Sequence, residues 1–230
     1  MISQFAGYER LAPLDLDAYR DRYGNIGRLD LILEAEGDAA NRYQVAKQAD
    51  VLMLFYLLSA EELREVLHGL GYELEPETIR RSVEYYAARA VHGSTLSAVV
   101  HAWVTARVDR RASWEQFRRA LAADVADTQG GTTATGIHLG AMAGTVDLLQ
   151  RCYTGLEVRG DALWLNPVLP EQISRLGFAL AYRDHWVALD VDHDRLLVSA
   201  MPSQARSATV VIGGERHRLR PGQRIEVALA

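Results

Sequence analysis

The sequence is poor in cysteine, and this scarcity excludes two kinds of stabilising site. Cys152 is the single cysteine among 230 residues. A disulfide within the chain needs two cysteines, and cysteine-based zinc sites use several thiolates. Neither can form from this chain alone. Because proteins without disulfides are typical of the reducing cytoplasm, we expect a cytoplasmic protein.

The sequence also lacks an excess of positive charge and long apolar runs. Its formal net charge is -5 at pH 7, whereas nucleic acids and anionic membranes attract clustered cations. The longest apolar run, 49–58, is interrupted by Asp50 and is far shorter than the roughly 20 residues of a membrane span. No basic segment followed by an apolar stretch comes after Met1, so we expect no secretory signal. We therefore predict no nucleic acid partner and no membrane partner.

Lysine is nearly absent as well, although arginine is common. Lys47 is the one lysine beside 24 arginines. Since arginine has replaced lysine elsewhere, Lys47 indicates a position that needs a compact ammonium group. The alternative is the chance survival of one surface lysine. The remaining composition, 49% hydrophobic and 24% charged, is typical of one or two globular domains with a real core.

The first two thirds of the chain show helical spacing of apolar residues. Ser59 with Glu62 matches a capping box, Pro76 fits the first turn of a helix, and Ser113 fits a helix cap. Short polar connections separate the segments, as antiparallel helix pairs require. The pattern predicts helices over 15–22, 44–58, 60–70, 76–90, 95–109, 113–125 and 138–154.

Beyond Gly155 the pattern changes to short strands. Turn signals, Gly213-Gly214 and Pro221-Gly222, lie between them. We therefore predict an α+β protein with a helical domain over 1–155 and an antiparallel, sandwich-like β-sheet domain over 156–230. The predicted strands cover 162–165, 177–182, 186–191, 195–199, 208–212 and 224–228.

The segment before the most apolar helix carries the first candidate binding residues, Lys47 and Gln48. A cation and an amide at the entry to such a helix would lie at the rim of a pocket, where they could bond sugar hydroxyls. The alternative is a surface pair that begins an amphipathic helix.

A second candidate is the loop His92-Gly93-Ser94-Thr95, which leads directly into a predicted helix. Backbone N–H groups at a helix start carry partial positive charge, and hydroxyls and an imidazole add donors. The loop therefore suits an oxyanion such as phosphate. The alternative is that Ser94 or Thr95 caps the helix and His92 is solvated.

A third candidate is the segment 130–138, which holds Gly136 and His138 and is the longest small-residue stretch of the chain. Its glycines allow close backbone approach, and its hydroxyls and histidine offer donors. No strand and no Gly-Lys-Ser/Thr accompany it, so it matches neither a nucleotide phosphate loop nor a dinucleotide fingerprint. The alternative is a plain loop in which Thr135 caps the next helix.

The remaining histidines and the tryptophans indicate no further site. The histidines lack the spacing of metal ligands, so we predict no metal and no cofactor. The tryptophans are interpreted as core or interface residues rather than sugar platforms. These residues are His68, His101, His185, His193 and His217, with Trp103, Trp114, Trp164 and Trp186.

Three strings in this order resemble the C-terminal half of glycoside hydrolase family 65, which includes maltose, trehalose and kojibiose phosphorylases. They are 47–57 (KQADVLMLFYL), 92–97 (HGSTLS) and 136–145 (GIHLGAMAGT), and 166–170 (NPVLP) extends the similarity into the strand region.

The resemblance implies the later helices of an (α/α)6 barrel followed by a C-terminal β-sheet domain. It places Lys47 and Gln48 at the sugar, and His92, Ser94, Thr95, Gly136 and His138 around inorganic phosphate. The implied reaction is phosphorolysis of a glucosyl disaccharide with inversion, giving β-glucose 1-phosphate and glucose. Such a site needs donors rather than a second carboxylate, because phosphate brings its own nucleophilic oxygen.

Two departures from the family pattern stand out. Thr135 occupies a position where family members usually have glutamate, and no acidic residue matches the motif of the general acid. The family places that acid further upstream of Lys47 than this sequence reaches. We therefore expect no catalytic residue in this sequence. We expect an N-terminal portion or another chain to complete the barrel, and a homo-oligomer as the assembly. The alternatives are a non-catalytic structural or carbohydrate-binding fragment, and a family 65 hydrolase.

Overall fold

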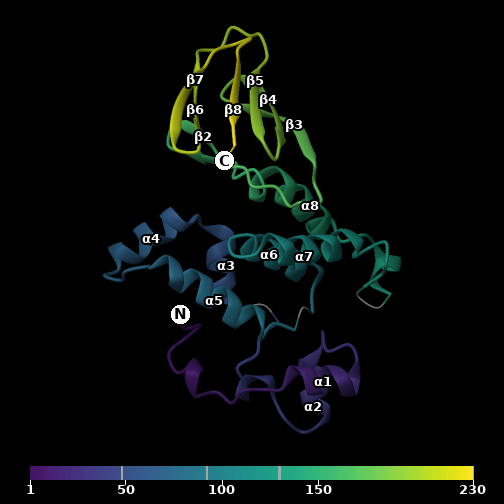
Figure 1. Cartoon of the computed structure of the whole chain (residues 1–230). Helices are drawn as coiled ribbons and strands as arrows, with labels where there is room; N and C mark the ends of the chain where they lie inside the picture. Colours follow the sequence, from purple (N-terminus) through teal and green to yellow (C-terminus); the bar gives the residue numbers. More distant parts are fainter. Residues whose placement is uncertain (48, 92, 129–130, 230) are drawn as a thin grey trace. The chain divides into compact units, whose positions relative to one another are not determined.

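The structure is a computed structural model that describes residues 1–47, 49–91, 93–128 and 131–229. It divides into two compact units, Met1–Gly144 and Thr145–Ala230. Helices make up the purple to teal part of Figure 1, and strands the green to yellow part. The α+β class predicted from the sequence is confirmed. The predicted domain boundary after residue 155 stays a prediction.

The first unit consists of helices joined by short loops. Helices α6 and α7 follow one another in the chain and pack together. Helix α8 begins in this unit and its last turn belongs to the second. The α-helices are α1 (Leu16–Tyr23), α2 (Leu29–Ala35), α3 (Asp50–Leu57), α4 (Ala60–Gly69), α5 (Pro76–Ala87), α6 (Thr95–Thr105), α7 (Arg110–Ala122) and α8 (Leu139–Asp147). Short 3-10 turns cover Tyr8–Arg10, Ala40–Arg42 and Thr132–Thr135, and a π-helical turn covers Leu148–Cys152.

Local chemistry sets several of the helix starts. Ser59 and Glu62 form the predicted capping box at α4, and Pro76 is the first residue of α5. The predicted cap at Ser113 is wrong, because Asp109 is the N-cap residue of α7 and its side chain accepts a hydrogen bond from Ala112 N. Ser113 lies buried inside the helix and donates to the carbonyl oxygen of Ala102 on α6, 2.6 Å away.

The predicted helix over 44–58 is shorter than expected, because its first residues make long-range backbone bonds. Ala46 pairs with Ala90 in an isolated parallel bridge, in which Ala46 N donates to Arg89 O and Val91 N donates to Ala46 O. These bonds hold the segment before α3 extended. Lys47 therefore lies in a loop ahead of α3 rather than within it.

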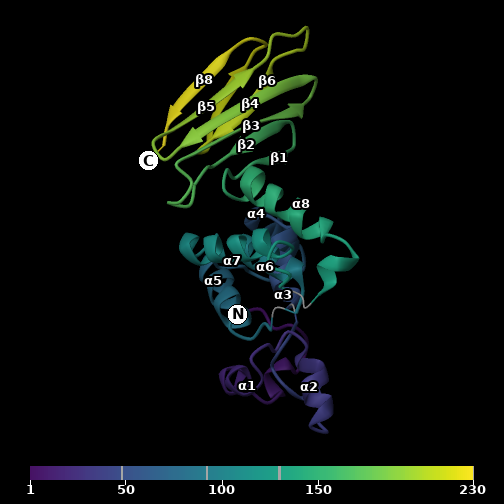
Figure 2. The ribbon, with the colours of Figure 1, turned by 90° about the vertical axis from the view of Figure 1, so that its right-hand side faces the viewer.

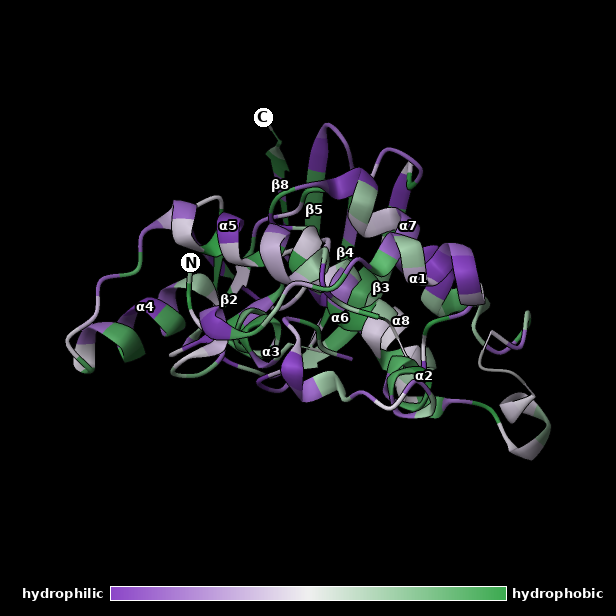
Figure 3. Ribbon diagram, turned by 90° about the horizontal axis from the view of Figure 1, so that it is seen from below, coloured by the Kyte–Doolittle hydropathy of each residue, from purple (hydrophilic) through white to green (hydrophobic). Residues whose placement is uncertain are grey.

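Two apolar clusters contribute to the core in the described part of the first unit. The larger joins α3, α5 and α6 through residues such as Leu52, Phe55 and Tyr86, and the smaller surrounds Leu33 of α2. Figure 3 shows α3 and α8 coloured mainly as hydrophobic and α1 with many hydrophilic residues. Helix α8 lies close to α6, since a Cβ on Gly144 would be 2.6 Å from Cγ1 of Val99.

The second unit contains two four-stranded sheets, visible in Figure 2. One sheet has the order β1-β2-β6-β7 and the other the order β3-β4-β5-β8. Pairing is antiparallel except between β2 and β6, which run parallel. The strands are β1 (Glu157–Arg159), β2 (Ala162–Leu165), β3 (Arg175–Tyr182), β4 (His185–Asp192), β5 (Arg195–Ala200), β6 (Ala208–Ile212), β7 (Glu215–Leu219) and β8 (Arg224–Ala228).

Each predicted strand is present, and β1 and β7 are additional. Strand β7 has the sequence Glu-Arg-His-Arg-Leu, whose polar residues produce no apolar alternation. Alternation is clear in β4, where Val187, Leu189 and Val191 are buried and their neighbours are more exposed. One face of the second sheet is thus buried and the other meets solvent. In the described part of the chain, no helix has the length and apolar character to cross a membrane.

Candidate functional site

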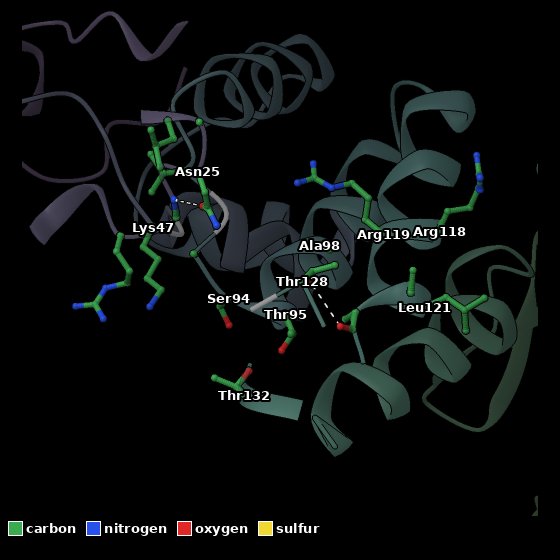
Figure 4. A pocket seen from close by; sticks show the side chains of 18 of the residues that line it. Asn25, Lys47, Ser94, Thr95, Ala98, Arg118, Arg119, Leu121, Thr128 and Thr132 are labelled. Atoms are coloured by element: carbon green, nitrogen blue, oxygen red, sulfur yellow. Dashed lines mark hydrogen bonds between the residues drawn. The ribbon is translucent and has the colours of Figure 1, made fainter. Parts of the chain in front are cut away.

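An open cavity of about 1450 Å3 lies within the first unit (Figure 4). Three regions of the chain line it: the loop between α1 and α2 with Lys47, the loop that enters α6, and the second half of α7 with the segment after it. The residues that contribute are Arg20, Gly24, Asn25, Ile26, Gly27, Arg28, Lys47, Val91, Gly93, Ser94, Thr95, Ala98, Glu115, Arg118, Arg119, Leu121, Ala122, Ala123, Val125, Thr128 and Thr132.

Lys47 lines the cavity beside a very close backbone contact between Gly93 and Gly27. A Cβ on Gly93 would be 2.1 Å from the carbonyl oxygen of Gly27 and 3.0 Å from Cε of Lys47. Glycine at 93 therefore allows the α1–α2 loop, the lysine stem and the α6 entry loop to meet. Among the residues that the structure describes, no hydrogen bond or ion pair involves the Lys47 ammonium. It is exposed and available to a ligand.

Ser94 and Thr95 place two hydroxyl groups at the start of α6. Ser94 is the N-cap residue, and its Oγ accepts a hydrogen bond from Leu96 N at 3.3 Å. Thr95 is the first helical residue and is 8% exposed. In Figure 4 the hydroxyl oxygens of Ser94, Thr95 and Thr132 face one another across the cavity. Ser94 therefore caps α6, as the alternative interpretation expected, and it also lines the cavity.

A carboxylate on one side holds His138 in place, and a hydroxyl lies on the other. Asp124 Oδ1 lies 2.5 Å from Nδ1 of His138, and Asp124 Oδ2 accepts a hydrogen bond from His138 N at 3.0 Å. On the opposite edge of the ring, Nε2 lies 3.3 Å from Oγ1 of Thr132. The hydrogen bond to His138 holds the pKa of Asp124 below its ordinary value. The Asp124 side chain is 10% exposed and that of His138 27%.

Local hydrogen bonds also fix the conformation of the rest of the 131–138 segment. Asp127 Oδ1 accepts from Thr133 N at 3.3 Å, and Thr135 Oγ1 donates to Thr132 O at 2.7 Å. Gly136 has a φ of +142°, a conformation that favours glycine, and a Cβ there would have open space around it. Thr135 belongs to a 3-10 turn and does not cap α8.

The cavity wall carries more cations than anions. Arg20, Arg28, Lys47, Arg118 and Arg119 line it, against one carboxylate, Glu115, among the described lining residues. Two of these arginines are engaged at short distance, Arg20 with Asp17 at 2.6 Å and Arg28 with Asp30 at 2.9 Å. The contact between Arg118 and Glu115 is longer, at 3.5 Å. The net field of the wall favours an anion in the cavity.

Three of the predicted site residues, Lys47, Ser94 and Thr95, line one cavity. His138 is connected to it through Thr132, whereas Gly136 is not among the described residues of its wall. Gln48 and His92 lie outside the described residues. In the same described part of the chain, no group of three or more histidine, cysteine, aspartate or glutamate side chains is arranged to hold a metal ion.

Comparison with protein families decides what kind of chain this is. Residues 1–147 match the glycosyl hydrolase family 65 central catalytic domain, and residues 156–219 match the C-terminal domain of the same family. The chain belongs to glycosyl hydrolase family 65. The resemblance read from the three sequence strings is thereby confirmed.

Two relatives show how much of a family 65 protein is present. An uncharacterized glycosyl hydrolase of Mycobacterium tuberculosis is 55% identical over 227 residues, which is 99% of this chain and 17% of that protein. The trehalose 6-phosphate phosphorylase of Lactococcus lactis is 37% identical over 201 residues, 87% of this chain and 26% of that enzyme. The family 65 chain thus spans between about a sixth and a quarter of these relatives.

A solved structure supports the fold. A human-microbiome protein provisionally named kojibiose phosphorylase matches the whole family 65 chain with a TM-score of 0.78 at 19% sequence identity. The match covers 28% of that protein. At this identity the similarity concerns the fold.

The sequence analysis missed Asp124, whose carboxylate contacts His138 directly. Asp124 follows α7 closely and lies 14 positions before His138, so no short motif connects the two. In the family 65 chain it makes more hydrogen bonds to the 131–138 segment than any other described side chain outside that segment. An acidic residue at the end of the predicted helix over 113–125, followed by a loop with a histidine, was the available signal.

Proposed function

We propose that this chain is the C-terminal part of an inverting α-disaccharide phosphorylase that uses inorganic phosphate to give β-glucose 1-phosphate. The observation that carries the proposal is the shared cavity of Lys47, Ser94 and Thr95, with Thr132 linking it to His138. Hydroxyl donors and an excess of cations suit a phosphate ion. The family 65 relatives named for phosphorolysis support this assignment.

In the proposed site, Lys47 and Gln48 bind the sugar whose glycosidic bond breaks. Ser94, Thr95, Gly136 and His138, with His92, bind phosphate. Phosphate attacks the anomeric carbon while a carboxylic acid protonates the leaving oxygen from the opposite side. That acid is assigned to a part of a longer protein outside these 230 residues, within a catalytic domain that includes 1–155 and completes an (α/α)6 barrel. Residues 156–230 form the accessory β-sheet domain.

The scarcity of carboxylates in the proposed phosphate site favours a phosphorylase over a family 65 hydrolase. An inverting hydrolase needs a second carboxylate to activate water. Glu115 is the one carboxylate among the described lining residues, and it faces Arg118 on its own helix. A carboxylate beside phosphate would also repel it. Thr135, at the usual glutamate position, keeps a further negative charge away from this segment.

The reaction is tested with a longer protein that contains the chain. Trehalose, kojibiose, maltose and trehalose 6-phosphate are each incubated with and without phosphate, and glucose 1-phosphate and glucose are quantified. Phosphate-dependent release of glucose 1-phosphate supports the proposal, and its anomeric form is read by NMR. Release of glucose alone, independent of phosphate, identifies a hydrolase instead. No turnover of any of these four sugars favours the non-catalytic alternative.

Two variants separate the proposed roles of the site residues. Lys47→Ala removes the ammonium group that bonds the sugar, so the KM for the disaccharide rises while that for phosphate changes little. His138→Ala removes a phosphate ligand, so the KM for phosphate rises. Losing a hydrogen bond to a charged group costs about 1.5–3 kcal/mol, or roughly 10- to 150-fold in either constant. His68→Ala, at an exposed histidine of α4, is the matched control. Unchanged phosphate kinetics in His138→Ala would refute its assignment.

A further inference from the structure

The loop that carries His138 is held from outside by a carboxylate that no family resemblance singles out. Asp124 lies just beyond the end of α7 and contacts the 131–138 segment at three atoms. These are Nδ1 of His138 at 2.5 Å, N of His138 at 3.0 Å, and Oγ1 of Thr133 at 3.4 Å. The side chain is 10% exposed, so water competes little for these bonds.

The geometry determines which ring nitrogen can face a ligand. A charged carboxylate only accepts hydrogen bonds, so Nδ1 of His138 must be the nitrogen that carries a proton toward Asp124. The ring is then oriented with Nε2 toward Thr132, whose side chain belongs to the cavity wall. A ring without this contact would rotate about its side-chain bonds and lose a defined direction.

We propose that Asp124 is a positioning residue for the anion site, holding His138 with its Nδ1 proton toward the carboxylate and its Nε2 toward the cavity. The expected effect on phosphate binding rests on the proposed function. The orientation of the His138 ring does not depend on it. Carboxylates that bond metal-ligating histidines orient the ring in this way, and their loss typically costs about 10- to 100-fold in metal affinity or activity.

The first experiment measures the ring itself. Histidine labelled with 15N is incorporated into the 230-residue chain, and His138→Ala identifies the signal of His138. In the wild type we expect Nδ1 to carry a proton. In Asp124→Asn the amide oxygen can still accept from His138 N, and the amide nitrogen faces Nδ1. Because that nitrogen donates, the proton moves to Nε2 and the tautomer reverses.

Asp127→Asn is the matched control. Asp127 also bonds the segment, through Thr133 N, but does not touch His138. Its φ is +45°, a conformation that asparagine tolerates. The His138 signal should keep the wild-type tautomer in this variant. The same tautomer in wild type and Asp124→Asn would overturn the proposal, whether or not the chain binds phosphate.

The second experiment measures inorganic phosphate binding by calorimetry in a longer protein that contains the chain, for wild type, Asp124→Ala, His138→Ala and the double variant. Asp124→Ala should weaken binding by about tenfold or more. If Asp124 acts through His138, adding Asp124→Ala to His138→Ala changes the affinity by less than about twofold. An undiminished effect in the His138→Ala background would show that Asp124 acts by anchoring the loop, and would refute a positioning role. If wild type binds no phosphate, the proposed function fails, and the tautomer measurement still decides the inference.

Discussion

The closest backbone contact at the site provides the sharpest stability test. In Gly93→Ala, the new Cβ would lie 2.1 Å from the Gly27 carbonyl oxygen, whereas real Cβ atoms keep at least 3.0 Å from other heavy atoms. The opposing atom belongs to the backbone, so no side-chain rotation relieves the clash. The α6 entry loop and the α1–α2 loop must therefore separate by about 1 Å, at a cost of roughly 1–3 kcal/mol.

The separation should affect function as well as stability, because the Lys47 stem contacts the same Cβ position at 3.0 Å. Displacements of about 1 Å in positioning groups cost on the order of 100-fold in rate. We expect kcat/KM of a longer protein containing the variant to fall by about that factor. The Tm of the 230-residue chain should fall by roughly 2–4 °C for each kcal/mol lost.

Gly69→Ala is the matched control for Gly93→Ala. Gly69 ends α4 and has no atom within 4 Å of its Cβ position. Alanine there should leave the Tm unchanged or raise it, since glycine in a helix costs about 0.5–1 kcal/mol relative to alanine. A Gly93→Ala protein with the melting temperature and activity of the wild type would refute the close contact between the two loops.

Three further outcomes can be checked by unfolding of the 230-residue chain. Gly144→Ala should destabilise the chain by about 1–3 kcal/mol in urea, because the new Cβ would lie 2.6 Å from Cγ1 of Val99 and a valine in a helix has little rotamer freedom. Equal stability of the variant and the wild type would contradict the α6–α8 contact. Ser59→Ala should cost about 0.5–2 kcal/mol by removing the capping box of α4, and Ser3→Ala, at an exposed serine outside any helix, should cost far less. The lowered pKa of Asp124 means that its bonds stabilise the fold above its ordinary pKa of 3.8 and are lost as pH falls through the lower folded value. The stability difference between wild type and Asp124→Asn should therefore persist from pH 7 to about 4 and shrink below it, and a difference that vanished already at pH 6 would contradict this.

Local sequence signals determined much of the architecture. The α+β class, the capping box at Ser59, the start of α5 at Pro76 and the six apolar strands follow from spacing and turn chemistry within a few residues. The order of the three strings around Lys47, Ser94 and His138 was sufficient to indicate the family. These features were predictable because neighbours along the chain decide them.

The tertiary structure decided the features that join distant residues. The bridge between Ala46 and Ala90 shortened the predicted helix before α3, and the parallel pairing of β2 with β6 departs from the expected antiparallel sheet. The contact of Gly93 with Gly27 and the hydrogen bond between Asp124 and His138 likewise connect separate loops. Local periodicity carries no information about such pairs, because packing of the whole unit brings them together. The sequence therefore indicated the candidate binding residues, and the fold determined which of them share a cavity.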